Sequence, residues 1–260
     1  MLRILVWEFG KLIRLRSVQV GLLASLLLPV LWVIAPGLRN QFHLNLISAW
    51  QVPALSLRTG MDFLFPFLVA MAAAEVLGSE VSLGTLKSVL LRPSPRSRLL
   101  LAKLLVALLY PFLLLATSLA GSLLVGIPYG LGNFYGGTGL NQPDAIQAFV
   151  GMGLMTSQAA LLEVVKAHLL AGLVLAPIAA LSLLYGTIFL ATTTAALAAI
   201  SSLLLMRLLV AFPSVQPFLL TTYLGLYVEP SSLFMGLSLL FIYTAGFSGL
   251  AMLVFDRKDV

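Results

Sequence analysis

The 260-residue sequence contains no cysteine and very little charge. The absence of cysteine excludes disulfide bonds, thiolate metal sites and cysteine nucleophiles. Aspartate, glutamate, lysine and arginine together make up only 9% of the residues, whereas 60% are hydrophobic and the mean hydropathy is +1.07. Soluble domains contain roughly 45–50% apolar residues, so this chain has too few polar side chains to cover the surface of a water-soluble fold. The composition therefore predicts an integral membrane protein.

The sequence also lacks the signals of a nucleotide site, a metal site or a separate soluble domain. It has no P-loop of the GxxxxGK[ST] kind, which excludes ATP binding by that motif. His43 and His168 have no second ligand at metal-binding spacing. The net charge of +6 is explained by basic residues at the cytoplasmic ends of membrane spans, without nucleic acid as a partner. We therefore predict a single transmembrane domain over residues 1–260, with no catalytic residues and no cofactor on this chain.

Long apolar runs predict six transmembrane helices, since a spanning helix needs about 20 mostly apolar residues. The 46-residue run 167–212 is too long for one crossing of a core about 30 Å thick, so we divide it at a turn near Ala191–Thr194. Residues 38–60 are interpreted as a polar loop, and residues 145–166 as an amphipathic helix or an N-terminal extension of the next span. The six predicted spans cover about residues 18–36, 61–78, 99–127, 167–190, 192–212 and 232–255.

Basic residues are distributed unevenly over the two ends of these spans. Six spans put both termini on one side, and the positive-inside rule makes that side the cytoplasm if the protein lies in the cell membrane. The predicted fold class is thus an all-α, multi-pass membrane protein with both termini cytoplasmic. Eleven basic residues fall on the side of the termini and four on the other: Arg3, Lys11, Arg14, Arg16, Lys87, Arg92, Arg96, Arg98, Lys103, Arg257 and Lys258 against Arg39, Arg58, Lys166 and Arg207.

The N-terminal residues form an amphipathic helical pattern before the first span. Arg3, Lys11 and Arg14 share one face of a helical wheel. This pattern predicts a helix that lies in the membrane interface with its cations toward the lipid headgroups. The alternative is a basic juxtamembrane run that only fixes the topology. The opposite, apolar face carries Leu2, Leu5, Val6, Phe9, Leu12 and Ile13.

Residues 80–98, EVSLGTLKSVLLRPSPRSR, concentrate charge between the second and third predicted spans. Thr85 can cap a short helix that has an apolar and a basic side and ends before Pro93. A short amphipathic element at this place is suited to transmit force to a soluble partner, whereas an ordinary loop would need its basic residues only to set orientation. The pattern alone leaves both interpretations open. The apolar side would carry Leu86, Val89 and Leu90, and the basic side Lys87 and Arg92.

The same stretch resembles a signature of exporter-type ABC transporter permeases, six-span membrane subunits with the architecture of O-antigen exporters. In that family a cytosolic loop after the second span commonly reads E-x-x-x-G-T-L and then R-P-x-x-R. One departure is Pro95, where many members carry a branched residue or serine before the basic one. The matching residues here are Glu80, Gly84, Thr85, Leu86, Lys87, Arg92, Pro93 and Arg96.

The resemblance implies that this loop is a coupling helix that docks onto an ATPase subunit. Gly84 would permit a tight approach, Thr85 would cap the helix, and Leu86 and Val89 would insert into a groove of the partner. The remaining members Glu80, Lys87, Arg92 and Arg96 would supply polar contacts around them, because arginine pairs well with carboxylates at interfaces.

The resemblance further implies a transport subunit without an ATPase site of its own. The expected function is the membrane-spanning permease of an exporter, which works with a separate ATPase that holds ATP and Mg²⁺ and with a second, identical or different, permease copy. No ionisable cluster lies near the middle of a predicted span, which favours a hydrophobic or amphiphilic cargo. Hydroxyl groups near the fifth span could line the path or merely hold helices together: Thr192, Thr193, Thr194, Ser201 and Ser202.

Two other classes of function remain as alternatives. A secondary transporter or channel would place ionisable groups or broken helices near the bilayer midplane. Glu75 is a candidate for such a group, although a pairing with Lys103 would explain it structurally. A remote alternative is an intramembrane serine protease, because GFSG at residues 246–249 presents Ser248; such an enzyme needs a histidine base, and both histidines precede the serine by a long distance in the sequence.

Overall fold

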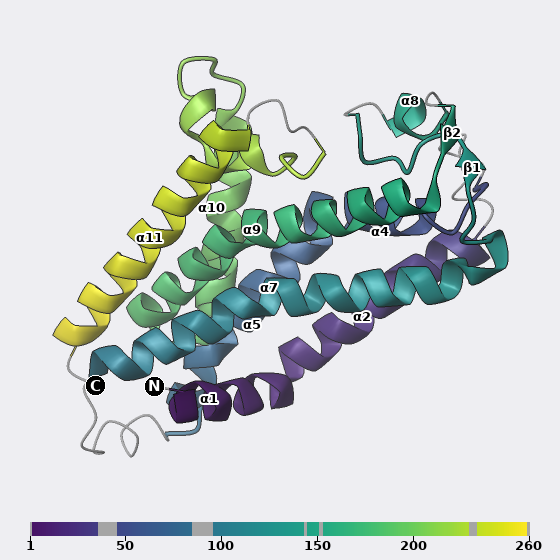
Figure 1. Ribbon diagram of the computed structural model, residues 1–260. Helices are drawn as coiled ribbons and strands as arrows, with labels where there is room; N and C mark the ends of the chain where they lie inside the picture. The colour runs from purple at the N-terminus through teal and green to yellow at the C-terminus, as the bar shows by residue number, and fades with distance from the viewer. Residues whose placement is uncertain are drawn as a thin grey trace.

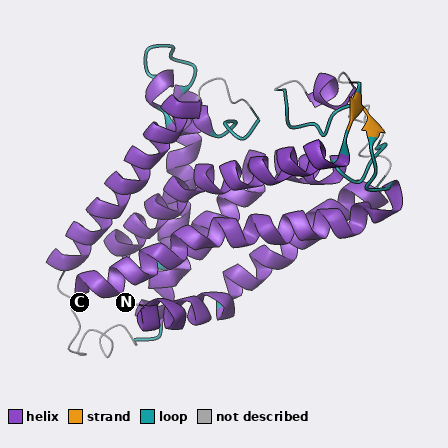
Figure 2. Cartoon of the chain, in the orientation of Figure 1, coloured by secondary structure: helices purple, strands orange, loops and turns teal. Residues whose placement is uncertain are grey.

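A computed structural model describes residues 2–35, 46–84, 96–142, 145–150, 153–228 and 233–258. Helices dominate the chain, and a two-stranded antiparallel sheet lies at one end of the molecule (Figure 2). Within the described residues, six helices are long and apolar enough to cross a membrane. The predicted all-α membrane fold is confirmed.

The elements carry the labels of Figure 1. The six candidate spans are α2 (Arg16–Ile34), α4 to α5 (Gln51–Thr59 and Phe65–Ser82, joined by the π-helical η1, Gly60–Leu64), α7 (Arg96–Gly126), α9 (Ser157–Phe189), α10 (Thr192–Leu209) and α11 (Leu233–Arg257). The other elements are α1 (Leu2–Arg14), η2 (Ile127–Tyr129), β1 (Phe134–Tyr135), α8 (Ala145–Val150), β2 (Leu154–Met155), η3 (Gln216–Phe218) and η4 (Leu220–Tyr223).

The second span begins about ten residues earlier than predicted, because α4 lies within the expected polar loop 38–60. Most of α4 is buried, and its polar side chains find partners inside the fold. The Gln51 amide donates to the Gly137 carbonyl at 3.1 Å, and the Ser56 hydroxyl donates to the Val52 carbonyl at 3.0 Å. A buried polar group is stable when it is hydrogen-bonded. The loop prediction was therefore wrong for residues 51–59.

The fourth span is also longer than its apolar run. α9 begins at Ser157, where the Thr156 side chain caps the helix by accepting a hydrogen bond from the Ala159 backbone. Of the two interpretations of residues 145–166, the N-terminal extension holds for residues 157–166, while α8 is a separate short helix.

The predicted turn between the fourth and fifth spans is present. α9 ends at Phe189, and Leu190 takes the left-handed conformation with φ of 53° before α10 begins at Thr192. The Leu190 backbone donates to the Gly186 carbonyl at 3.0 Å. The side chain of Lys258 donates to the carbonyls of Thr187 and Ile188, so a cation from the C-terminus satisfies the last turn of α9.

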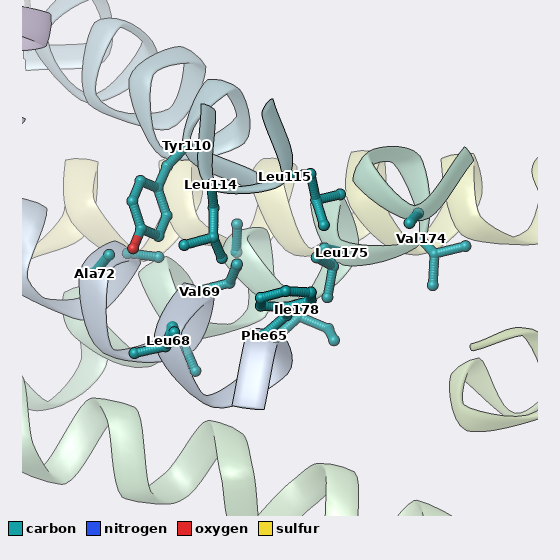
Figure 3. Packing of buried hydrophobic residues seen from close by; sticks show 14 of the residues in the cluster. Phe65, Leu68, Val69, Ala72, Tyr110, Leu114, Leu115, Val174, Leu175 and Ile178 are labelled. Carbon is teal, nitrogen blue, oxygen red and sulfur yellow. The ribbon is translucent and has the colours of Figure 1, made fainter. Parts of the chain in front are cut away.

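α9 is the central helix of the bundle and packs against α5, α7, α10 and α11. Figure 3 shows Phe65, Leu68 and Val69 of α5 facing Leu114 and Leu115 of α7 and Leu175 and Ile178 of α9. Lipid tails are as apolar as leucine, so close packing rather than the exclusion of water holds such helices together. By contrast, less than a third of α2, α10 and α11 is buried, so much of their surface is left for lipid or a partner chain.

The two ends of the bundle differ. The N-terminus, the C-terminus, the end of α5 and the start of α7 lie together at the lower left of Figure 1, which we call the termini end. The strands β1 and β2 and the short helix α8 lie at the opposite end, beyond the far ends of α2 and α7. The described helices on either side of residues 85–95, α5 and α7, therefore meet at the termini end.

Candidate functional site

Four charged side chains from three helices meet at the termini end. Lys11 of α1 lies 2.9 Å from Glu8 and 2.6 Å from Glu80, measured from its Nζ to the nearest carboxylate oxygen. Lys103 of α7 lies 2.9 Å from both Glu8 and Glu80. Each lysine thus bridges both glutamates, and Glu80 belongs to α5. We call Glu8, Lys11, Glu80 and Lys103 the charge ring.

The charge ring is buried. Glu8, Glu80 and Lys103 are exposed by only 3%, 6% and 1%, and Lys11 is partly exposed. Two carboxylates and two ammonium groups sum to no net charge, which makes burial tolerable. Taking ions out of water is nevertheless costly, and a buried pair that loses one partner typically destabilises a protein by about 3–5 kcal/mol. The four groups therefore depend on each other.

The ring joins the two helices that flank residues 85–95. Glu80 lies in the last turn of α5, and Lys103 lies two turns into α7. The Lys103 ammonium also donates to the Val76 carbonyl of α5 at 3.2 Å. Through Glu8 and Lys11 the same cluster fixes α1. A movement of the end of α5 or the start of α7 would therefore be transmitted to the other helix and to α1.

Gly84 ends α5 in a conformation that favours glycine. Its φ is +66°, and its backbone donates to the Val81 carbonyl at 3.0 Å, which closes the last turn. A Cβ at this position would meet nothing within 4 Å among the described residues. Backbone conformation is thus one reason for glycine here, and the close approach of a partner implied by the resemblance stays a prediction.

The other residues of the predicted docking surface are not placed by the structure. Arg96 is the first residue of α7, but its side chain is not among those described. On the predicted interface helix α1, Arg3 and Arg14 are exposed, while Lys11 is taken up by the charge ring. Outside the described residues lie Thr85, Leu86, Lys87, Val89, Arg92 and Pro93.

Sequence reasoning missed Glu8 and gave Lys103 a different partner. The expected Glu75–Lys103 pair is replaced by Glu75 accepting a hydrogen bond from the backbone of Ser17 at 3.0 Å, which caps the first turn of α2. The available signals were that Glu8 is the only acid in a basic helix and lies three residues before Lys11, and that Lys103 is a cation inside an apolar run. A cation in such a run needs a partner.

Of the other residues considered as chemical candidates, His43 lies outside the described residues, while His168 and Ser248 each make a hydrogen bond within their own helix. His168 is buried, with its Nδ1 2.8 Å from the Val164 carbonyl. In the part of the chain that the structure describes, no group of three or more His, Cys, Asp or Glu residues could hold a metal ion. The Ser248 hydroxyl donates to the Thr244 carbonyl at 2.5 Å within its own helix, as expected for a packing residue.

The sequence was compared with known protein families and curated proteins. The family model described as ABC-2 family transporter protein matches residues 4–188, more than two thirds of the chain. The matched range contains the whole charge ring and residues 80–98. No curated protein matches the chain significantly.

Proposed function

Because the chain belongs to the ABC-2 family of transporter proteins, we propose that it moves its cargo out of the cytoplasm with ATP hydrolysed by a separate subunit. It is a multi-pass membrane protein and the permease subunit of an ABC transporter, a class that works with an ABC ATPase. ATP and Mg²⁺ would be held by that ATPase. We place the complex in the cell membrane, with both termini of this chain in the cytoplasm.

We assign the contact with the ATPase to residues 85–96. The observation that carries this assignment is the charge ring, which ties together the helices on both sides of the segment. A permease needs a rigid link between its docking segment and its spans, because a flexible link would dissipate the motion of the ATPase. Glu80 and Gly84 position the segment in this proposal, and Leu86, Val89 and Arg92 contact the partner.

The cargo path is proposed along α10. One face of α10 carries exposed hydroxyl and leucine side chains at helical spacing: Thr193, Leu197, Ser201, Leu204 and Leu208. Such a face suits a hydrophobic or amphiphilic cargo. One bundle can supply only one wall of a path, so a second permease copy would supply the other.

Two of the five candidate hydroxyls serve the fold instead. Ser202 lies 2.8 Å from the Tyr185 hydroxyl of α9, and Thr192 packs closely against Gly78 of α5. These contacts hold α10 against its neighbours, as the packing interpretation expected. Thr193, Thr194 and Ser201 are exposed and remain candidates for the path.

Replacement of Arg92 by Ala tests the docking proposal. We expect Arg92→Ala to insert normally but to lose co-purification with the ATPase or transport-linked ATP hydrolysis, since truncating one partner of an interfacial charge pair costs about 2–5 kcal/mol. Arg207→Ala, at the other end of the bundle, is the matched control. Unchanged assembly and hydrolysis in Arg92→Ala would reduce the segment to a loop that sets topology. With the complex reconstituted in lipid vesicles, stimulation of ATP hydrolysis by amphiphiles but not by simple ions would support a hydrophobic or amphiphilic cargo.

A further inference from the structure

An open groove of about 480 Å³ runs along the outward face of α1. Its residues are spaced by three or four positions along the helix, so they form one continuous stripe. The opposite face of α1 holds Glu8 and Leu12, which are buried against the bundle. The groove is lined by Arg3, Val6, Trp7, Gly10, Lys11 and Arg14.

The groove carries positive charge that the protein does not neutralise. The Lys11 ammonium is held by Glu8 and Glu80 and lies 3.5 Å from the centre of the Trp7 ring. Arg3 and Arg14 are exposed and have neither an ion pair nor a hydrogen bond within the described residues. They stand eleven residues apart, about 16 Å along the helix axis. Two guanidinium groups thus flank the groove and lack an anion.

The centre of the groove has room for a bulky group. A Cβ at Gly10 would meet nothing within 4 Å among the described atoms, so the floor between the two arginines is open. Val6, Trp7 and Ile13 are exposed by 62%, 46% and 42% beside these cations. A small soluble anion would satisfy the arginines and leave the three apolar side chains in water. A ligand with a charged head and an apolar tail satisfies both.

The position of the groove indicates where such a ligand comes from. α1 ends at Arg14, and the membrane-spanning α2 begins at Arg16, which is also exposed. The groove therefore lies at the border of the bilayer, where tryptophan is enriched and where basic residues attract anionic lipid. We propose that this groove is a binding site for the phosphate headgroup of an anionic phospholipid, with Arg3 and Arg14 as its ligands. The inference needs only that the chain spans a membrane and does not depend on the exporter proposal.

The three tryptophans of the chain allow a direct test. Trp7 is exposed in the groove, whereas Trp32 and Trp50 are buried elsewhere. We would reconstitute the full-length protein into vesicles of phosphatidylcholine. In one series an increasing fraction of this lipid is replaced by brominated phosphatidylglycerol, and in the other by brominated phosphatidylcholine, with the bromine near the headgroup in both. Bromine quenches tryptophan on contact. We expect brominated phosphatidylglycerol to quench at a several-fold lower fraction than brominated phosphatidylcholine, and Trp7→Phe to lose this component.

Arginine variants then assign the site. Each basic residue near a membrane surface attracts anionic lipid by about 1 kcal/mol, so Arg3→Gln and Arg14→Gln should each weaken the preference roughly fivefold. Arg207→Gln, at the other end of the bundle, should preserve it. Using the single variants keeps the test valid if the double variant does not insert.

Four results would overturn the proposal. The first is equal quenching by the two brominated lipids, and the second is an undiminished preference in both arginine variants. The third is loss of ATPase co-purification in these variants with lipid preference intact, which would identify the groove as a protein-docking surface. Added inorganic phosphate that abolishes the preference would indicate a site for a soluble anion instead.

Discussion

At the scale of single residues, the charge ring brings together four side chains from three separate helices. The charge ring joins residues as distant in sequence as Glu8 and Lys103, and no local pattern in the sequence connects them. The sequence could show that Lys103 needs an acidic partner, but it did not distinguish Glu75 from Glu8 and Glu80. Glu75 was the wrong choice, because it accepts a hydrogen bond from the Ser17 backbone instead. Partner choice among buried charges depends on which helix ends meet, and that depends on the tertiary fold.

Removing the Lys103 ammonium should destabilise the folded protein. Lys103→Met removes one of the two cations of the charge ring from Glu8 and Glu80, and the expected loss is about 3–5 kcal/mol. The measurement is the thermal unfolding midpoint of the purified protein in detergent, followed by tryptophan fluorescence. Lys166→Met, an exposed cation of α9, is the control and should change little.

A paired variant distinguishes charge from packing in this result. Glu80→Gln with Lys103→Met removes one charge of each sign, so it should recover much of the stability that Lys103→Met loses. A single variant as stable as the parent would mean that the ring does not stabilise the bundle. A double variant that is less stable than Lys103→Met would mean that the lysine acts through its contacts rather than its charge.

The left-handed backbone conformation of Leu190 predicts that its replacement by glycine stabilises the folded protein. A non-glycine residue at a positive φ costs of order 1 kcal/mol, and Leu190 adopts φ of 53° between α9 and α10. Leu190→Gly should therefore raise the unfolding midpoint slightly, whereas Leu190→Val should lower it, because a β-branched side chain tolerates this conformation poorly. The same detergent unfolding assay measures both, and a lower midpoint for Leu190→Gly would show that the leucine side chain contributes more than the strain costs.

At the scale of helices, hydropathy predicted where spans lie better than where they end. The runs 61–78 and 167–190 became helices Gln51–Ser82, with a π-helical interruption, and Ser157–Phe189. The helical turns that the prediction left out of the second span carry polar residues such as Gln51 and Arg58. Their hydrogen-bond acceptors are backbone carbonyls of the segment after the third span. A hydropathy profile assigns such residues to a loop, because it contains no information about the carbonyl groups that they bind in the folded protein.

Close packing of α5 and α10 predicts that replacement of Gly78 by a larger residue destabilises the protein. A Cβ at Gly78 would lie 2.8 Å from the Thr192 backbone nitrogen and 2.1 Å from its hydroxyl oxygen, so the two helices would have to separate. Gly78→Ala should cost about 1–3 kcal/mol in the detergent unfolding assay. Gly246→Ala on the exposed face of α11 meets nothing within 4 Å and should be neutral or stabilising. Equal effects of both substitutions would contradict the close approach.

At the scale of the whole molecule, parity of the spans decides the topology. The weak point of the sequence prediction was the turn after α9, which carries no charge of its own. Lys258 supplies that charge, because its ammonium binds the last carbonyls of α9 and so places the C-terminus beside this turn. The connection spans about 70 residues and could not be read from the sequence. It supports a bundle in which α9, α10 and α11 each cross the membrane once.

The topology can be tested with tags at three positions. A tag after residue 260 and a tag within residues 85–95 should be accessible from the cytoplasm, because the described helix ends next to these sites lie at the termini end and the sequence assigns eleven of the fifteen basic residues to that side. A tag within residues 133–142, next to β1, should be accessible only from outside. Cysteine substitutions suit this experiment, since the chain contains none and each introduced thiol can be labelled alone with an impermeant reagent. Labelling of the C-terminal thiol from outside, with a thiol in residues 85–95 labelled only from the cytoplasm, would mean an odd number of crossings between them, and would exclude both the six-span bundle and the placement of Lys258 at the end of α9.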